Sequence, residues 1–237
     1  MRSVLTIAVL ASALLNTSAQ AVVDLGPYRA ASLKKWESAI TKLEALDKTE
    51  AHPDDAILFV GSSSIRRWDT IATDMAPYHP IRRGFGGSRW SDVAIFADRL
   101  ITPHKFRAVV FFVANDISGR DSDKSPDEVA ALFAHVWQRV RAHAPDAPVF
   151  YIAVTPTPSR WAAWSKTKAA NSKVSEFCSS KNNTWFIGTE SIYLDANGQP
   201  RPDLFVADRL HLNPEGYTRW AAAIKSHLDT VLGGAGT

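Results

Sequence analysis

The sequence predicts an α/β fold, a three-layer α/β/α sandwich on a parallel sheet of about five strands. Short apolar runs alternate with longer segments of helical spacing over most of the chain. Two of the runs, at residues 56–60 and 106–113, are apolar at nearly every position, as is typical of strands buried on both faces of a parallel sheet. Strands that alternate with helices in this way form βαβ units, with helices on both faces of the sheet.

Two of the predicted strands lie before residue 106. Residues 28–47 place apolar side chains at helical spacing, which predicts an amphipathic helix. Residues 56–60 form a strand that ends at Gly61, and residues 81–83 lead into the glycine-containing segment 84–88. Helical spacing follows each strand, marked first by Ile65, Trp68 and Ile71 and then by Val93, Ile95, Phe96 and Leu100.

The rest of the chain continues the alternation. Ser125 followed by a proline is a typical helix start, and that helix should end near His143. The remaining elements are expected as strands at 106–113, 149–155 and 185–188, a helix at 161–180, and a final helix that Asn213 and Pro214 open and that ends near Leu232.

The N-terminus has the pattern of a signal peptide. Arg2 provides a positive charge, Val4–Leu15 is an apolar segment too short to span a membrane, and Ser18–Ala21 offers an Ala-x-Ala cleavage site. We therefore expect residues 1–21 to be removed on export and residues 22–237 to form a single domain with no membrane span. The product would be periplasmic or secreted.

Composition excludes several classes of function. Loss of residues 1–21 lowers the net charge from +3 to +2, and the chain has no basic run, so nucleic acid is not an expected partner. Cys178 is the only cysteine, so no internal disulfide can form. No metal-binding spacing of histidine or cysteine occurs, and we expect neither a metal nor another cofactor.

Polar residues follow the strands at the edge where a parallel sheet binds its ligands. They are three serines at 62–64, the pair Gly86-Gly87, the pair Asn115-Asp116, and the segment Asp208–His211 after the last strand. Ester hydrolysis through an acyl-enzyme requires a hydroxyl, a histidine and a carboxylate, with N–H donors for the oxyanion. The sequence thus predicts an ester substrate, either a small molecule or a carbohydrate.

Four separated blocks also resemble the SGNH (GDSL-type) hydrolases, and they occur in that family's order: Phe59-Val-Gly-Ser-Ser63, Gly84-Phe-Gly-Gly-Ser88, Val113-Ala-Asn-Asp116 and Asp208-Arg-Leu-His-Leu-Asn-Pro-Glu-Gly216. The resemblance implies a flavodoxin-like sheet. It also implies that Ser63 is the nucleophile, His211 the base and Asp208 the acid that orients it. The oxyanion hole would consist of the Ser63 and Gly87 N–H groups and the Asn115 amide.

The chain departs from the family pattern at two positions. Ser62 occupies the place of an aspartate before the nucleophile, and Val113 that of a glycine two residues before Asn115. Ser64 is an alternative nucleophile, but the Gly-x-Ser offset from Gly61 favours Ser63. The sequence fits an α/β-hydrolase less well, because the second glycine of the G-x-S-x-G turn of that fold is missing here.

The loop after the predicted fourth strand should lie over the same edge. Arg160 and Trp161 there could contact a polar or sugar-like substrate, and Asp116 is a third candidate for substrate binding. Packing of the tryptophan on the core is the alternative.

The leading hypothesis is an exported serine esterase for short acyl esters, including acetyl esters. The alternatives are an acetyltransferase acting on envelope or polysaccharide sugars, a lysophospholipase or thioesterase, and a binding module without turnover. The sequence predicts no oligomeric state.

Overall fold

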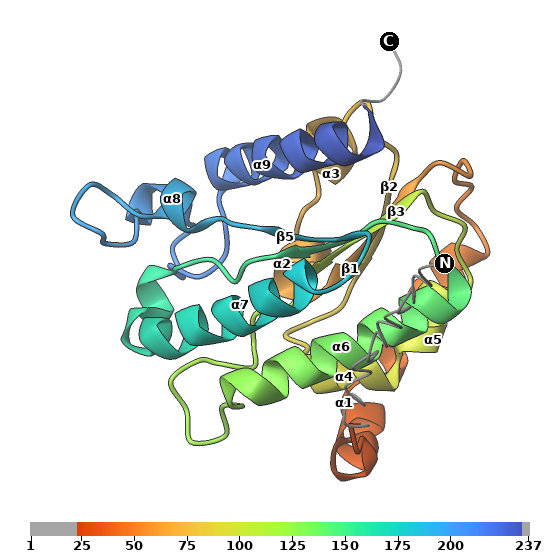
Figure 1. Ribbon diagram of the computed structural model, residues 1–237, viewed down its shortest axis with the longest axis horizontal. Helices are drawn as coiled ribbons and strands as arrows, with labels where there is room; N and C mark the ends of the chain where they lie inside the picture. Colours follow the sequence, from red (N-terminus) through yellow and green to blue (C-terminus); the bar gives the residue numbers. More distant parts are fainter. Residues whose placement is uncertain (1–22, 234–237) are drawn as a thin grey trace, which may run out of the picture.

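A five-stranded parallel sheet forms the centre of the computed structural model, which describes residues 23–233 (Figure 1). Its strands lie in the order β2-β1-β3-β4-β5. Their bounds are β1 Ile57–Gly61, β2 Pro80–Gly84, β3 Ala108–Phe112, β4 Val149–Ile152 and β5 Thr184–Ile187. The predicted three-layer α/β sandwich is thereby confirmed.

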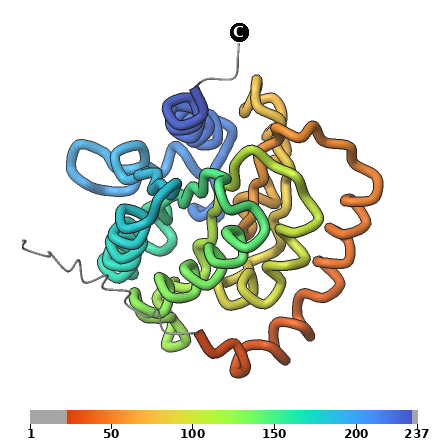
Figure 2. The backbone as a smooth tube through the Cα atoms, turned by 45° about the vertical axis from the view of Figure 1, so that its right-hand side comes forward, coloured from red at the N-terminus to blue at the C-terminus, as the bar shows by residue number. Residues whose placement is uncertain are grey.

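Helices cover both faces of the sheet. They are α1 Gly26–Asp47, α2 Ser63–Arg66, α3 Ile71–Asp74, α4 Trp90–Ile95, α5 Ala97–Ile101, α6 Pro126–His143, α7 Trp164–Ser179, α8 Glu190–Tyr193 and α9 Pro214–Leu232, with short 3₁₀ segments η1 Pro158–Ala163 and η2 Pro202–Leu204. In Figure 1, α9 and α8 lie above the sheet, while α4, α5, α6 and α7 lie below it. Figure 2 shows α1 curving around the outside of the molecule.

Alternation along the buried strands divides the core into two clusters. Leu58 and Val60 of β1 pack toward α4, α5, α6 and α7, whereas Ile57 and Phe59 pack toward α9. Because successive strand residues point to opposite faces, a strand covered on both sides must be apolar at every position. All five residues of β1 are buried, as the unbroken apolar run predicted.

The strand order brings distant loops together at one edge of the sheet. β1 lies between β2 and β3, and Gly61 at its end pairs with Gly84 on one side and Phe112 on the other. The segments that leave these three strands therefore begin next to one another. They contain Ser63, Gly87 and Asn115, which are far apart in the sequence.

Several element bounds differ from the prediction. The strand expected at 149–155 ends at Ile152, and Val154 instead bonds through its backbone to the side chain of Asn171 on α7. The helix expected at 161–180 begins only at Trp164, because residues 161–163 belong to the 3₁₀ segment η1. The helix expected after the second strand is divided into α4 and α5 at Phe96, and the segment after β1 into α2 and α3.

The signal peptide predicted for residues 1–21 lies outside the described residues. Within residues 23–233, none of the helices combines the length and the apolar character that a membrane crossing requires.

Candidate active site

Ser63 lies at the turn between β1 and α2. It is the first residue of the short α2 helix, and the extended residue Ser62 before it donates its backbone N–H to the Phe112 carbonyl at 3.0 Å. The turn requires a glycine at position 61, because a Cβ atom there would overlap that same Phe112 carbonyl oxygen. The tight junction between neighbouring strands therefore fixes the backbone immediately before Ser63.

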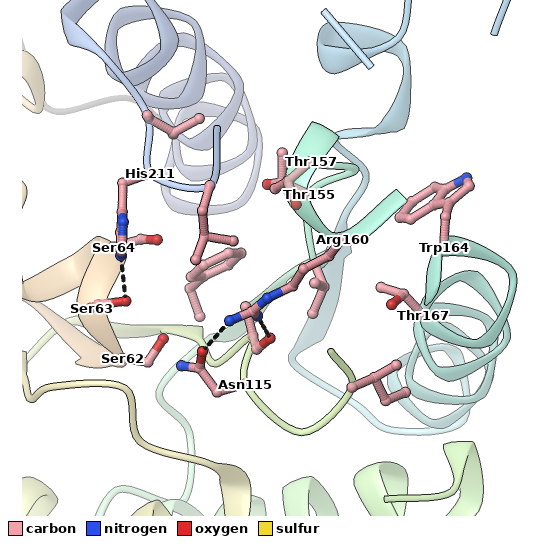
Figure 3. A pocket seen from close by; sticks show the side chains of 16 residues that line it. Ser62, Ser63, Ser64, Asn115, Thr155, Thr157, Arg160, Trp164, Thr167 and His211 are labelled. Atoms are coloured by element: carbon pink, nitrogen blue, oxygen red, sulfur yellow. Dashed lines mark hydrogen bonds between the residues drawn. The ribbon is translucent and has the colours of Figure 1, made fainter. Parts of the chain in front are cut away.

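The structure brings three predicted residues together (Figure 3 draws two of them). Ser63 Oγ lies 2.8 Å from His211 Nε2, and His211 Nδ1 lies 2.7 Å from Asp208 Oδ2. Ser63 and His211 are 148 positions apart in the sequence. The sequence resemblance predicted this pairing, and the distances are those at which a histidine can accept a hydroxyl proton while a carboxylate orients its ring.

The surroundings of Asp208 favour its ionised form. Its Oδ1 accepts the backbone N–H groups of Leu210 and His211, each at 2.9 Å. Partial burial raises the pKa of Asp208, but the hydrogen bonds from His211 and Leu210 outweigh it and hold that pKa well below its usual range. A charged carboxylate is what a neighbouring imidazole needs when it takes up a proton.

The loop that contains Asp208 and His211 is held in a closed shape. Arg209 adopts a positive φ of 56° and donates its N–H to the Val206 carbonyl, and Val206 donates to the His211 carbonyl at 2.9 Å. At the end of the loop, the Asn213 side chain accepts the Gly216 N–H at 2.9 Å and so caps α9, as the sequence predicted. The compact loop lets two residues three positions apart meet through their side chains.

Asn115 and Gly87 lie together on the other side of Ser63. A Cβ atom on Gly87 would be 3.8 Å from Asn115 Nδ2. The preceding Gly86 has a positive φ of 41° and packs so closely on the Trp36 ring that a side chain would overlap it. The glycine pair therefore brings the backbone of Gly87 close to the Asn115 amide, and these are two of the groups predicted for the oxyanion hole.

The three residues predicted to bind substrate are placed differently from one another. Arg160 lines a hollow beside Ser63, a small pocket that Asn115 and His211 also border. Trp161 stacks on Trp164 with 6.0 Å between ring centroids, and Trp164 is the one of the two that lines the hollow. Asp116 lies behind this hollow, where it is 3% exposed and accepts the Trp90 N–H at 2.9 and 3.2 Å. Burial raises the pKa of Asp116 to about 7.

The hollow beside Ser63 is small. Its volume is about 30 Å³, and a single water needs roughly 10–15 Å³ by the same measure, so it has room for about two groups of that size. Its walls are mostly apolar but include the buried hydroxyls of Thr155 and Thr157, which have no hydrogen-bond partner within residues 23–233. A long alkyl chain would match neither its size nor these hydroxyls.

A second and wider hollow begins on the other side of His211. It has a volume of about 460 Å³ and is lined by exposed residues that include Arg66, Arg67 and Thr70. Arg67 was not identified from the sequence, although its Nη1 lies 3.4 Å from Asp208 Oδ2. No sequence pattern links the end of α2 to the loop 141 positions later, so only the fold shows this contact.

Solved structures show the same fold. A Streptococcus pneumonia protein provisionally described as a platelet activating factor superposes with a TM-score of 0.73 at 20% identity, over 84% of this chain and 95% of that one. A GDSL-like lipase from Bacteroides thetaiotaomicron gives 0.68 at 16% identity, over 81% and 98%. A variant of an acetyl esterase with an acetate ion gives 0.58 at 16%, over 75% and 97%. At these identities the likeness establishes the fold.

The sequence itself matches a known family. No curated protein matches the chain. Residues 49–219, which include all four sequence blocks, match the model of the GDSL-like lipase/acylhydrolase family. The match covers well over half of the chain, and the chain therefore belongs to the GDSL-like lipase/acylhydrolase family.

Proposed function

We propose that this protein is an exported serine esterase that hydrolyses short-chain acyl esters, acetyl esters among them, through an acyl-enzyme. The observation that carries the proposal is the continuous contact from Ser63 Oγ to His211 Nε2 at 2.8 Å and from His211 Nδ1 to Asp208 Oδ2 at 2.7 Å. Export is inferred from the N-terminal sequence alone.

In the proposed reaction, Ser63 Oγ attacks the ester carbonyl while His211 Nε2 accepts its proton. Asp208 keeps Nδ1–H directed toward itself and stabilises the imidazolium that forms. The Ser63 and Gly87 N–H groups and Asn115 Nδ2 donate to the oxyanion, where each donor contributes roughly 10²–10³ in rate. His211 then protonates the leaving alcohol, and water, activated by the same histidine, releases the acid.

The two hollows support a small acyl group and a larger alcohol. The 30 Å³ hollow borders Ser63 and Asn115, where the carbonyl carbon and its oxygen would lie. The 460 Å³ hollow borders His211, which must reach the leaving oxygen. The difference in size suits an acetylated sugar as substrate and disfavours the long acyl chains of a lysophospholipase or thioesterase substrate. The wide hollow could also admit a sugar that accepts the acyl group.

The test is hydrolysis of p-nitrophenyl esters from acetate to octanoate. We expect the mature wild type to prefer acetate and butyrate, and Ser63→Ala and His211→Ala to lose at least 10³-fold in kcat. Ser172→Ala, an exposed serine on α7, is the matched control and should retain full activity. A folded Ser63→Ala variant that kept wild-type activity would overturn the proposal. With a sugar acceptor added to the assay, formation of an acylated sugar instead of free acid would indicate acyl transfer.

A further inference from the structure

Arg160 directs its charge at the protein rather than at the solvent. The side chain crosses the hollow beside Ser63 and ends at the loop after β3 (Figure 3). There Nη1 donates to the Ala114 carbonyl at 2.5 Å and Nη2 donates to Asn115 Oδ1 at 2.8 Å. Within residues 23–233, no carboxylate forms an ion pair with this guanidinium.

These contacts determine which way the Asn115 amide faces. Its Nδ2 donates to the Ser88 carbonyl at 3.1 Å, while its Oδ1 accepts from Arg160. A carbonyl can only accept and a guanidinium can only donate, so rotating the amide by 180° would oppose acceptor to acceptor and donor to donor. The two partners therefore allow one orientation, in which Nδ2 lies on the side of Gly87.

We propose that Arg160 is a positioning residue, which holds the Asn115 amide so that the second hydrogen on Nδ2 is available to the oxyanion. The inference rests on the proposed esterase function of the same site. It assigns Arg160 a role beyond the substrate contact expected from the sequence, because one N–H of each outer nitrogen of its guanidinium already donates to a protein oxygen.

The fork of the guanidinium explains the choice of residue. Two parallel N–H groups can bond two oxygens on adjacent residues, the backbone oxygen of Ala114 and the side-chain oxygen of Asn115. A lysine ammonium carries the charge but lacks the planar fork. The turn that holds Arg160 is itself fastened, since Ser159 donates its N–H to the Arg209 carbonyl at 3.1 Å, on the loop between Asp208 and His211.

A double-mutant cycle tests the inference. We expect Asn115→Ala to lower kcat for p-nitrophenyl acetate by roughly 10²–10³-fold and Arg160→Met to lower it by about 10–10²-fold, with KM changed less than about threefold. If Arg160 acts through Asn115, adding Arg160→Met to Asn115→Ala should cost less than about threefold more. Equal losses in both backgrounds, or a raised KM with kcat unchanged, would overturn it.

Two further variants separate geometry from charge and from folding. Burial and the nearby positive charge of Arg120 lower the pKa of Arg160, so Arg120 is close enough to be a matched control. Arg120→Met removes the same charge without touching Asn115 and should keep kcat within about twofold. Arg160→Lys retains the charge and should still lose about fivefold or more; it also replaces Arg160→Met in the cycle if that variant does not fold.

A measurement without turnover distinguishes failure of this inference from failure of the esterase proposal. The side-chain amide signals of Asn115 in a ¹H–¹⁵N spectrum can be identified by their loss in Asn115→Ala. We expect these protons to exchange with water at least about tenfold faster in Arg160→Met than in wild type or Arg120→Met. Unchanged exchange would overturn the positioning role even if the wild type proved inactive as an esterase.

Discussion

Asp208 holds His211 through two separate hydrogen bonds, one to its backbone and one to its ring. Oδ1 accepts the His211 N–H at 2.9 Å, and Oδ2 lies 2.7 Å from Nδ1. One carboxylate thus fixes both the position of the residue and the orientation of the imidazole. The spacing of three residues between Asp208 and His211 makes this possible, because backbone hydrogen bonds hold the loop between them in a closed shape.

Replacing Asp208 with asparagine should remove the charge while keeping the shape. Asp208→Asn can still accept the backbone N–H groups but no longer stabilises an imidazolium, so we expect kcat for p-nitrophenyl acetate to fall by roughly 10²–10⁴-fold with little change in KM. Asp203→Asn, an exposed acid nearby that pairs with Arg201, is the matched control. Loss of less than about fivefold in folded Asp208→Asn would show that this carboxylate is not needed.

Trp164 should limit the length of the acyl group. It lines the 30 Å³ hollow, so Trp164→Ala should enlarge the space and raise the ratio of kcat/KM for hexanoate over acetate by about fivefold or more. Trp161→Ala is the comparison, because this ring stacks on Trp164 without lining the hollow and should shift the ratio less. An unchanged ratio in Trp164→Ala would place the acyl group elsewhere.

Asp116 should make the stability of the protein depend on pH. Its pKa is about 7 in the folded protein because of burial, partly offset by the Trp90 N–H and the charges of Lys124 and Arg89, with Asp92 adding to the rise. The unfolded carboxyl has a pKa of about 3.9. Between these values the folded state binds the extra proton, so this contribution to stability is present below about pH 4 and is lost as the pH rises through 7.

The check is the unfolding temperature of wild type and Asp116→Asn from pH 4 to 8. The variant cannot ionise, so the wild-type Tm minus the variant Tm should decrease steadily as the pH rises across this range. Measuring the difference cancels the other groups that titrate over the same range. A difference that stayed constant would mean that Asp116 titrates alike in the folded and unfolded states.

Gly61 should tolerate no side chain. A Cβ atom there would overlap the Phe112 carbonyl oxygen of the neighbouring strand, which cannot move without breaking the sheet. Overpacking of this kind costs about 1–3 kcal/mol, and we expect Gly61→Ala to lower Tm by roughly 3–10 °C. Gly188→Ala is the matched control, since nothing lies within 4 Å of its added atom. Similar Tm values for the two variants would contradict the close approach.

Much of the fold followed from local patterns. The unbroken apolar run at β1, the proline-opened α6 and the Asn213 cap of α9 all depend on residues within a few positions of one another, and the structure agrees with each. Element ends were less accurate. The strand predicted to reach residue 155 stops at Ile152, because its partner β5 ends at Ile187 and pairing cannot continue.

The sequence by itself determined the α/β class, the edge of the sheet to examine, and the identity of the residues near Ser63, because residue type, spacing and order carry that information. The tertiary structure alone decided that Arg160 faces Asn115, that Arg67 approaches Asp208 and that Asp116 is buried behind the hollow. The physical reason is that these contacts join segments 26 to 141 positions apart. Strand order and loop closure set them, and a local pattern contains neither.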